Sequence, residues 1–105
     1  MDTIEENLKY FMSKYEDVYT AYENYGKKVH YDGGPLEEKI RWLIKVAISA
    51  SCQHHYSIKT HIRKAFKSGC TREEIEHAIL LTAPTAGFPT MMESMLALRQ
   101  ELDNK

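Results

Sequence analysis

Apolar residues recur at intervals of three and four positions along almost the whole chain, and no other property limits its possible folds as strongly. Spacing of this kind puts side chains on one face of an α-helix, whereas a half-buried strand alternates apolar and polar residues. The sequence contains no such alternation of useful length. At 105 residues the chain also has the size of one domain. We therefore expect a single all-α domain over residues 1–105.

Glycine and proline residues divide the pattern into about five predicted helices. The first carries a continuous apolar and aromatic seam made of Ile4, Leu8, Phe11, Tyr15, Val18, Tyr22 and Tyr25. Gly26 and the run Gly33-Gly34-Pro35 predict the loop that follows. The second helix is expected over residues 35–51, with Pro35 in its first turn. Its apolar residues cover two faces, which is typical of a central helix.

Helix boundaries are clearest in the C-terminal half. The third helix is predicted over residues 53–68, and Gly69 is a suitable left-handed stop. Thr71, followed three positions later by Glu74, has the spacing of a capping box that opens a fourth helix. Three helix-breaking residues precede the fifth helix: Pro84, Gly87 and Pro89. The fifth helix carries a methionine cluster, Met91, Met92 and Met95, which is expected to pack in the core.

Charge and composition argue against several classes of function. The net charge is −1 and the two signs are interspersed, so neither nucleic acid nor an acidic membrane surface is an expected partner. The first residues are acidic where a signal peptide would be basic, and no apolar run approaches the ~20 residues that span a bilayer. Cys52 and Cys70 are too few for a disulfide scaffold. We therefore expect a cytoplasmic protein with free thiols.

Residues 52–75 hold most of the reactive side chains. His54 and His61 are seven positions apart, so on one helix they would be nearly eclipsed and would border its apolar stripe. We expect both imidazoles to face a shared pocket between the second and third helices, with Ser57 on its polar side. The alternative for His61 is a core histidine bonded to a backbone carbonyl, and His54 and His55 are alternatively surface or interface histidines.

From Pro35 to about Leu98 the chain resembles the carboxymuconolactone decarboxylase and alkylhydroperoxidase D-like family. The resemblance rests on three segments: Pro-Leu-Glu-Glu-Lys before an apolar helix, His61-x-x-x-Ala65-x-x-x-Gly69-x-Thr71-x-Glu73-Glu74-Ile75, and Ala86-Gly87-Phe88-Pro89. It implies a small all-helical fold that self-associates into trimers or hexamers. It also implies a site near the histidine helix and close to a subunit boundary.

The chain departs from the peroxidase branch of this family at each key position. That branch has a Cys-x-x-Cys-x-x-x-His motif and an upstream glutamate. When the motif is anchored on His61, its two thiols fall at His54 and Ser57 and its carboxylate falls near Trp42. Peroxide reduction of this type needs an attacking thiolate and a resolving thiol. Among these groups, this chain retains only the histidine.

Two catalytic interpretations follow from the resemblance. The decarboxylase branch commonly reads Glu-x-x-x-His, where this chain reads Ser57-x-x-x-His61. A histidine titrates near neutral pH, so His61 fits an acid/base role on a small carboxylated or lactone substrate, with His54 holding a substrate carboxylate. The alternative is a thiol-dependent peroxidase with peroxiredoxin-type activity, in which Cys52 and His55 form a Cys–His pair.

Further alternatives involve binding rather than catalysis. A silent family member that binds a small molecule would explain why both thiols and the carboxylate are missing. Five residues are candidate ligands of a metal site: Cys52, His54, His55, His61 and His77. However, His54 and His61 are two helical turns apart, which is wider than the usual spacing of a pair of zinc ligands. We expect no cofactor or metal. The third helix also carries a basic strip of Lys59, Arg63, Lys64 and Lys67. In one interpretation it is solvated, and in the other Arg63 or Lys64 of a neighbouring subunit pairs with an anionic ligand.

Overall fold

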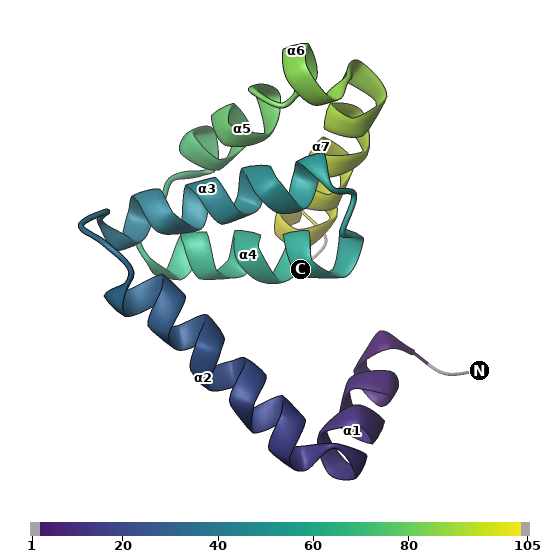
Figure 1. Cartoon of the computed structure of the whole chain (residues 1–105). Coiled ribbons are helices and arrows are strands. Elements are labelled where there is room, and N and C mark those ends of the chain that lie inside the picture. The colour runs from purple at the N-terminus through teal and green to yellow at the C-terminus, as the bar shows by residue number, and fades with distance from the viewer. Residues whose placement is uncertain (1–2, 104–105) are drawn as a thin grey trace. The chain divides into compact units, whose positions relative to one another are not determined.

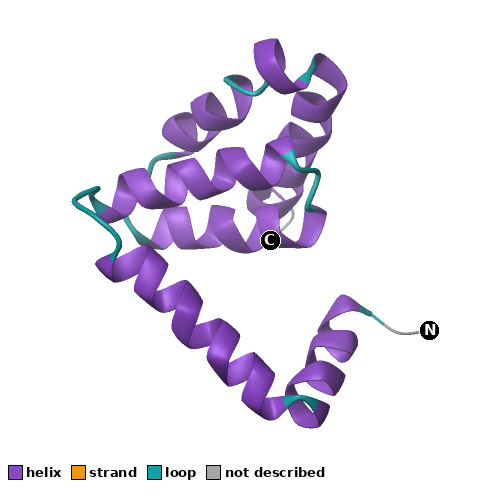
Figure 2. Ribbon diagram, viewed as in Figure 1, coloured by secondary structure: helices purple, strands orange, loops and turns teal. Residues whose placement is uncertain are grey.

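The computed structural model describes residues 3–103, and the regular elements of that range are all α-helices (Figures 1 and 2). They are α1 (Ile4–Lys14), α2 (Glu16–Asp32), α3 (Glu38–Ser51), α4 (His55–Lys67), α5 (Arg72–Leu80), α6 (Ala83–Ala86) and α7 (Phe88–Asp103). The predicted all-α class is confirmed. The helices outnumber the predicted five because the first predicted helix is two helices and α6 was not expected. The chain forms two compact units, α1 with α2 and α3 through α7.

The first unit begins with a capped helix. The Thr3 side chain accepts a hydrogen bond from the Glu6 backbone N–H, and the Glu6 carboxylate accepts one from the Thr3 N–H, each at 3.1 Å. The helix ends at Lys14, and the backbone of its C-cap, Tyr15, leaves the helical region at φ −122° and ψ 51°. The apolar spacing continues across this break, which is why the sequence predicted one helix. Gly26 lies inside α2 and not in a loop, so that prediction was wrong.

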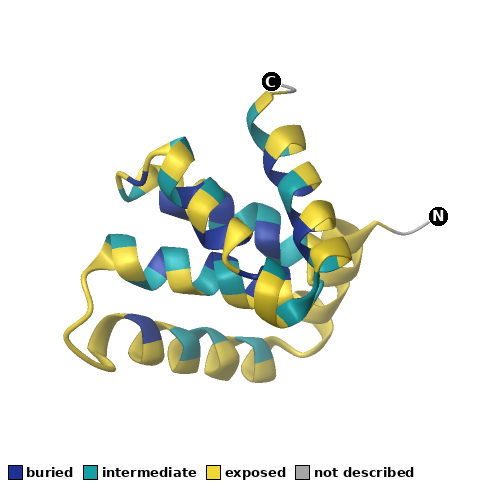
Figure 3. Cartoon of the chain, turned by 90° about the horizontal axis from the view of Figure 1, so that it is seen from above, coloured by how far each residue is buried: buried dark blue, intermediate teal, exposed yellow. Residues whose placement is uncertain are grey.

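The second unit has its core around α3, which contacts α4, α5 and α7. Six apolar side chains of this unit are almost completely buried: Val46, Ile58, Ile62, Ile75, Ile79 and Leu98. In Figure 3 the buried residues concentrate on the facing sides of these helices. This pattern confirms the prediction that the second predicted helix is central. Pro35 lies before the helix and not in its first turn, because α3 begins at Glu38 with Glu37 as its N-cap.

A tight turn joins α3 to α4, and the two helices run side by side in opposite directions (Figure 1). Gln53 has a positive φ of 58°, which few non-glycine residues adopt. Its amide nitrogen donates to the carbonyl oxygens of Ala50 and Thr90, each at 3.4 Å. The helix therefore begins at His55, two residues after the predicted start, and His54 is its N-cap.

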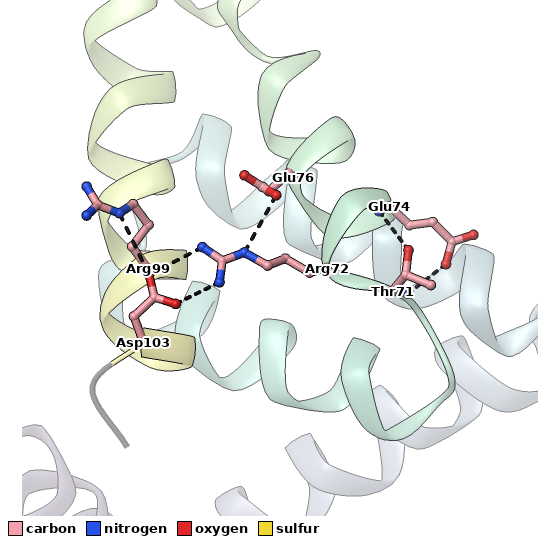
Figure 4. A network of polar contacts seen from close by, with 6 residues as sticks. All are labelled: Thr71, Arg72, Glu74, Glu76, Arg99 and Asp103. Atoms are coloured by element: carbon pink, nitrogen blue, oxygen red, sulfur yellow. Dashed lines mark hydrogen bonds and ion pairs between the residues drawn. The ribbon is translucent and has the colours of Figure 1, made fainter.

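The predicted stop of α4 and start of α5 are confirmed, whereas two of the three predicted breaks before the last helix are not. Gly69 has φ 97°, the left-handed conformation expected of a helix stop. Thr71 and Glu74 form the capping box, with bonds of 3.1 and 2.8 Å (Figure 4). Among the predicted breakers, Gly87 has φ 110°, whereas Pro84 lies in α6 and Pro89 in the first turn of α7. The fold therefore tolerates both prolines inside helices, near their starts, where no intrahelical N–H bond is lost.

Ion pairs connect the outer surface of α7 to α4 and α5. The Arg72 guanidinium contacts the Asp103 carboxylate at 2.6 and 3.3 Å and the Glu76 carboxylate at 3.6 Å (Figure 4). Arg63 of α4 pairs with Glu101 at 2.8 Å. Solvent weakens such pairs, so they orient the helices more than they stabilise them. Of the helices described over residues 3–103, none is both long enough and apolar enough to cross a membrane.

Candidate functional site

His61 is held between α3 and α4 by two hydrogen-bonding groups of α3. Its Nδ1 lies 2.6 Å from the hydroxyl oxygen of Ser49 and 3.2 Å from the carbonyl oxygen of Lys45. Ser49 is buried, with 3% of its surface exposed, and the imidazole is half-buried. Lys45 and Ser49 are four residues apart, so both groups lie on the same face of α3. The second and third predicted helices therefore meet at His61, as expected.

These contacts decide which nitrogen of His61 can act on a ligand. The Lys45 carbonyl can only accept a hydrogen bond, so it favours the tautomer with the proton on Nδ1. The Ser49 hydroxyl can either accept from Nδ1 or donate to it. With the proton on Nδ1, the basic lone pair is on Nε2. Within residues 3–103, no hydrogen-bonding group is placed against Nε2.

Two lysine side chains lie close enough to this imidazole to act on its charge. The ring of Trp42 lies 5.8 Å from that of His61, measured between centroids. The Lys45 ammonium is 4.8 Å from the Trp42 ring centroid, and the Lys64 ammonium is 5.7 Å from it. Burial lowers the pKa of His61, and the charges of Lys45 and Lys64 lower it further, against the opposing effect of the bond to the Lys45 carbonyl. These effects favour the neutral form of the His61 imidazole.

The lysine charges also affect each other. Burial lowers the pKa of Lys45, and the nearby charges of Arg41 and Lys64 lower it further. Neither Lys45 nor Lys64 forms an ion pair with any carboxylate of the described part of the chain. A group of like charges next to a titratable side chain is typical of a functional site.

The sequence profile of the carboxymuconolactone decarboxylase family matches residues 16–100 of this chain. The chain belongs to that family. It is also similar to an uncharacterized protein of Methanocaldococcus jannaschii, with 26% identity over 93 residues, which cover 89% of this chain and 86% of that protein. The matched range includes α2, in addition to the region from Pro35 to about Leu98 in which the sequence showed the resemblance.

The family resemblance placed the carboxylate of the peroxidase branch near Trp42. In the structure the ring of Trp42 lies beside that of His61. The indole N–H of Trp42 lies 3.4 Å from a carboxylate oxygen of Glu38. The imidazole therefore lies against an aromatic ring, near the position at which the resemblance gives the peroxidase branch a carboxylate.

Within residues 3–103, neither His54 nor Ser57 bonds to the imidazole of His61 through its side chain. The backbone of His54 is not helical, at φ −87° and ψ 80°, and the residue is exposed. Its N–H donates to the Ser49 carbonyl at 3.0 Å, but the part of the chain that the structure describes has no hydrogen bond or ring contact between His54 and His61. Ser57 is half-buried one turn before His61 on α4. The prediction that helical geometry eclipses the two histidines was wrong, because α4 begins after His54.

The two cysteines are separate and have different surroundings. Cys52 is exposed at the C-cap of α3, followed by the strained Gln53. Cys70 is buried, its sulfur lies 3.6 Å from the Lys39 carbonyl oxygen, and burial raises the pKa of its thiol. A raised pKa makes a thiol less reactive at neutral pH. Groups of three or more histidine, cysteine or acidic residues placed to hold a metal ion do not occur within residues 3–103.

Sequence reasoning missed Ser49 and the role of Lys45. Ser49 was detectable as a polar residue between Ile48 and Ala50 in an otherwise apolar helix segment. Buried hydroxyls need a partner, and His61 is twelve residues later on the next helix. No sequence pattern shows which residue of the next helix that partner is, because the answer depends on how α3 and α4 pack.

Proposed function

We propose that this carboxymuconolactone decarboxylase-family protein catalyses proton transfer on a small carboxylated or lactone substrate, with His61 as the acid/base. The observation that carries the proposal is the fixed Nδ1 of His61, bonded to Ser49 and to the Lys45 carbonyl. A held imidazole with a lowered pKa is a general base at neutral pH. The surrounding lysines suit an anionic substrate.

In this mechanism Nε2 of His61 takes up one proton from solvent once the anionic substrate is bound. The imidazolium that forms keeps both acceptors at Nδ1, which favour its charge. In the decarboxylation step, the bond to the carboxylate breaks, carbon dioxide leaves, and the electron pair moves toward the conjugated carbonyl. The imidazolium then gives its proton to the carbon that carries the resulting negative charge, and His61 ends the cycle as the neutral imidazole. The substrate carboxylate itself assists, because a negative charge nearby raises the pKa of His61 and makes the imidazolium more accessible.

The test uses 4-carboxymuconolactone, followed by its ultraviolet absorbance and by release of carbon dioxide. We expect His61→Gln to lose at least about a hundredfold in turnover, the usual contribution of a general acid/base group. The matched control is His55→Gln, because His55 is an exposed histidine at the start of the same helix. Equal turnover in the wild type and His61→Gln, with folding unchanged, contradicts the proposal.

Two further measurements on these variants separate the alternative functions. Hydroperoxide consumption that disappears in Cys52→Ser and persists in His61→Gln favours a thiol peroxidase. A melting temperature raised by the lactone, without turnover in any variant, favours a binding protein. We favour the proton-transfer function because contacts fix His61, whereas Cys52 is an exposed residue beside a turn.

We also propose that the chain self-associates, as the family resemblance implies for trimers or hexamers. An apolar groove of about 370 Å³ lies between α3, α5 and α6, lined in part by Leu43, Ala47 and Ala78. On α3 the side chains of Ile40, Ile44 and Ile48 are 40%, 43% and 56% exposed at four-residue intervals. Such a ridge beside a groove suits contact with another protein copy. Light scattering that gives the mass of a monomer at micromolar concentration contradicts this proposal.

A further inference from the structure

We infer that Lys45 and Lys64 bind the carboxylate of the substrate as a pair, beside His61. The inference rests on the proposed function for the identity of the reacting group, and it adds the residues that recognise the anion. Lys45 comes from α3 and Lys64 from α4, so the packing of the two helices creates the pair. Trp42 lies one turn before Lys45, and His61 lies one turn before Lys64.

The indole of Trp42 organises this pair. The two ammonium groups lie 4.8 and 5.7 Å from the centroid of its ring, which is within the range of a cation–π interaction. The His61 ring, at 5.8 Å, contacts the same indole. Three groups that could serve one ligand, two cations and a base, are therefore gathered around one aromatic side chain. A lysine held at a ring face loses less freedom when it binds an anion.

The charge balance around the pair points to an anion. Among the other basic residues of the same helices, Lys39 pairs with Glu74 at 3.5 Å and Arg63 with Glu101 at 2.8 Å, whereas Lys59 and Lys67 of α4 form no ion pair within residues 3–103. Lys45 and Lys64 also have no carboxylate partner within the described residues, although each repels the other. A bound carboxylate between them would remove that repulsion. The ligand class is therefore a small organic acid, bound through its ionised carboxylate.

The experiment measures binding without turnover, with crotonate and crotonamide as probes. The two molecules have nearly the same shape, and only crotonate has a charge. Amide chemical shifts of α3 and α4 are followed during NMR titration of the full chain. We expect crotonate to bind at least about tenfold more tightly than crotonamide, and binding to weaken as salt is raised.

Substitutions then test which lysines bind the carboxylate of crotonate. Lys45→Met and Lys64→Met keep the apolar stem of each side chain, so they change the charge with little change in packing. We expect each to weaken crotonate binding about tenfold, with crotonamide unaffected. The matched control is Lys59→Met, which removes the same charge from α4 about 140° around the helix from Lys64. Equal affinity for both probes, or an equal loss in Lys59→Met, overturns the inference.

The two proposals fail in different ways. If His61→Gln abolishes lactone turnover while Lys45→Met and Lys64→Met leave KM unchanged, the lysine inference is wrong and the proposed function stands. If crotonate binding depends on both lysines but no variant turns over a lactone, the anion site stands and the proposed chemistry is wrong.

Discussion

The two units of this chain have similar apolar periodicity but very different burial. In α1 no residue is buried, and in α2 the apolar seam is open, with Val18, Tyr22 and Tyr25 exposed by 57%, 67% and 70%. In the unit from α3 to α7 the same kind of spacing gives a core whose isoleucines are almost completely inaccessible. Periodicity therefore predicts which residues share a helix face, but it does not show whether that face meets another element.

The largest expected effect is the difference in stability between a substitution in the second unit and a similar one in the first. Ile62 is fully buried in the core of the second unit. We expect Ile62→Ala to lower the free energy of unfolding by about 2–5 kcal/mol, because it removes buried methylene groups and leaves a cavity. The matched change Val18→Ala, on the exposed seam of α2, should change it by less than about 0.5 kcal/mol. Urea unfolding followed by circular dichroism measures both.

A large loss of stability in Val18→Ala would contradict this comparison. It would show that the seam of α2 is buried in solution, by another part of the chain or by a second copy. Repeating the measurement at several protein concentrations distinguishes these cases, because only burial by a second copy makes the stability depend on concentration.

Much of the fold was predictable because its signals are local. The stop at Gly69 and the capping box of Thr71 and Glu74 need only a few neighbouring residues, and both were confirmed. The break at Tyr15 was not predictable, because no glycine or proline marks it and the apolar spacing continues through it. At Gly26 the error was the opposite one: a loop was predicted, but α2 continues through this residue. A single glycine lowers helix stability without ending the helix.

The candidate site was predictable in part. His61 was identified from its motif, and the two helices that hold it were expected to meet. Its main partner, Ser49, was not predicted, because the contact spans two helices and depends on their relative rotation. The expected pairing with His54 assumed that the helix began early, and the positive φ of Gln53 moves that start. Local rules thus found the residue, and packing determined its surroundings.

Two glycines, one in each unit, allow the units to be compared through smaller and more local changes in stability. Gly69, in the second unit, has a φ of 97°. We expect Gly69→Ala to lower the free energy of unfolding by about 1–2 kcal/mol, because a residue with a Cβ is strained in this conformation. Gly26 is inside α2 with open space around it. Gly26→Ala should therefore increase the helicity of α2 and add about 0.5–1 kcal/mol.

Differential scanning calorimetry checks the first of these effects and far-ultraviolet circular dichroism the second. If Gly69→Ala is as stable as the wild type, the α4 stop does not have the left-handed conformation in solution. If Gly26→Ala reduces helicity, Gly26 is at a helix end, and the loop predicted from the sequence is correct after all.

The smallest effect should appear in the pH dependence of stability. Burial and two nearby lysines lower the pKa of His61 in the folded chain, so the unfolded chain binds a proton at His61 more readily. The free energy of unfolding should therefore fall as pH is lowered through the ordinary histidine value of about 6.5, and this contribution should level off below the folded pKa. Urea unfolding of the wild type and His61→Gln, from pH 8 to pH 5, isolates the contribution. The two curves should converge as the pH falls, because only the wild type loses this stability. Parallel curves would mean that His61 is not desolvated, and the neutral base on which the proposed chemistry depends would then lack its physical cause.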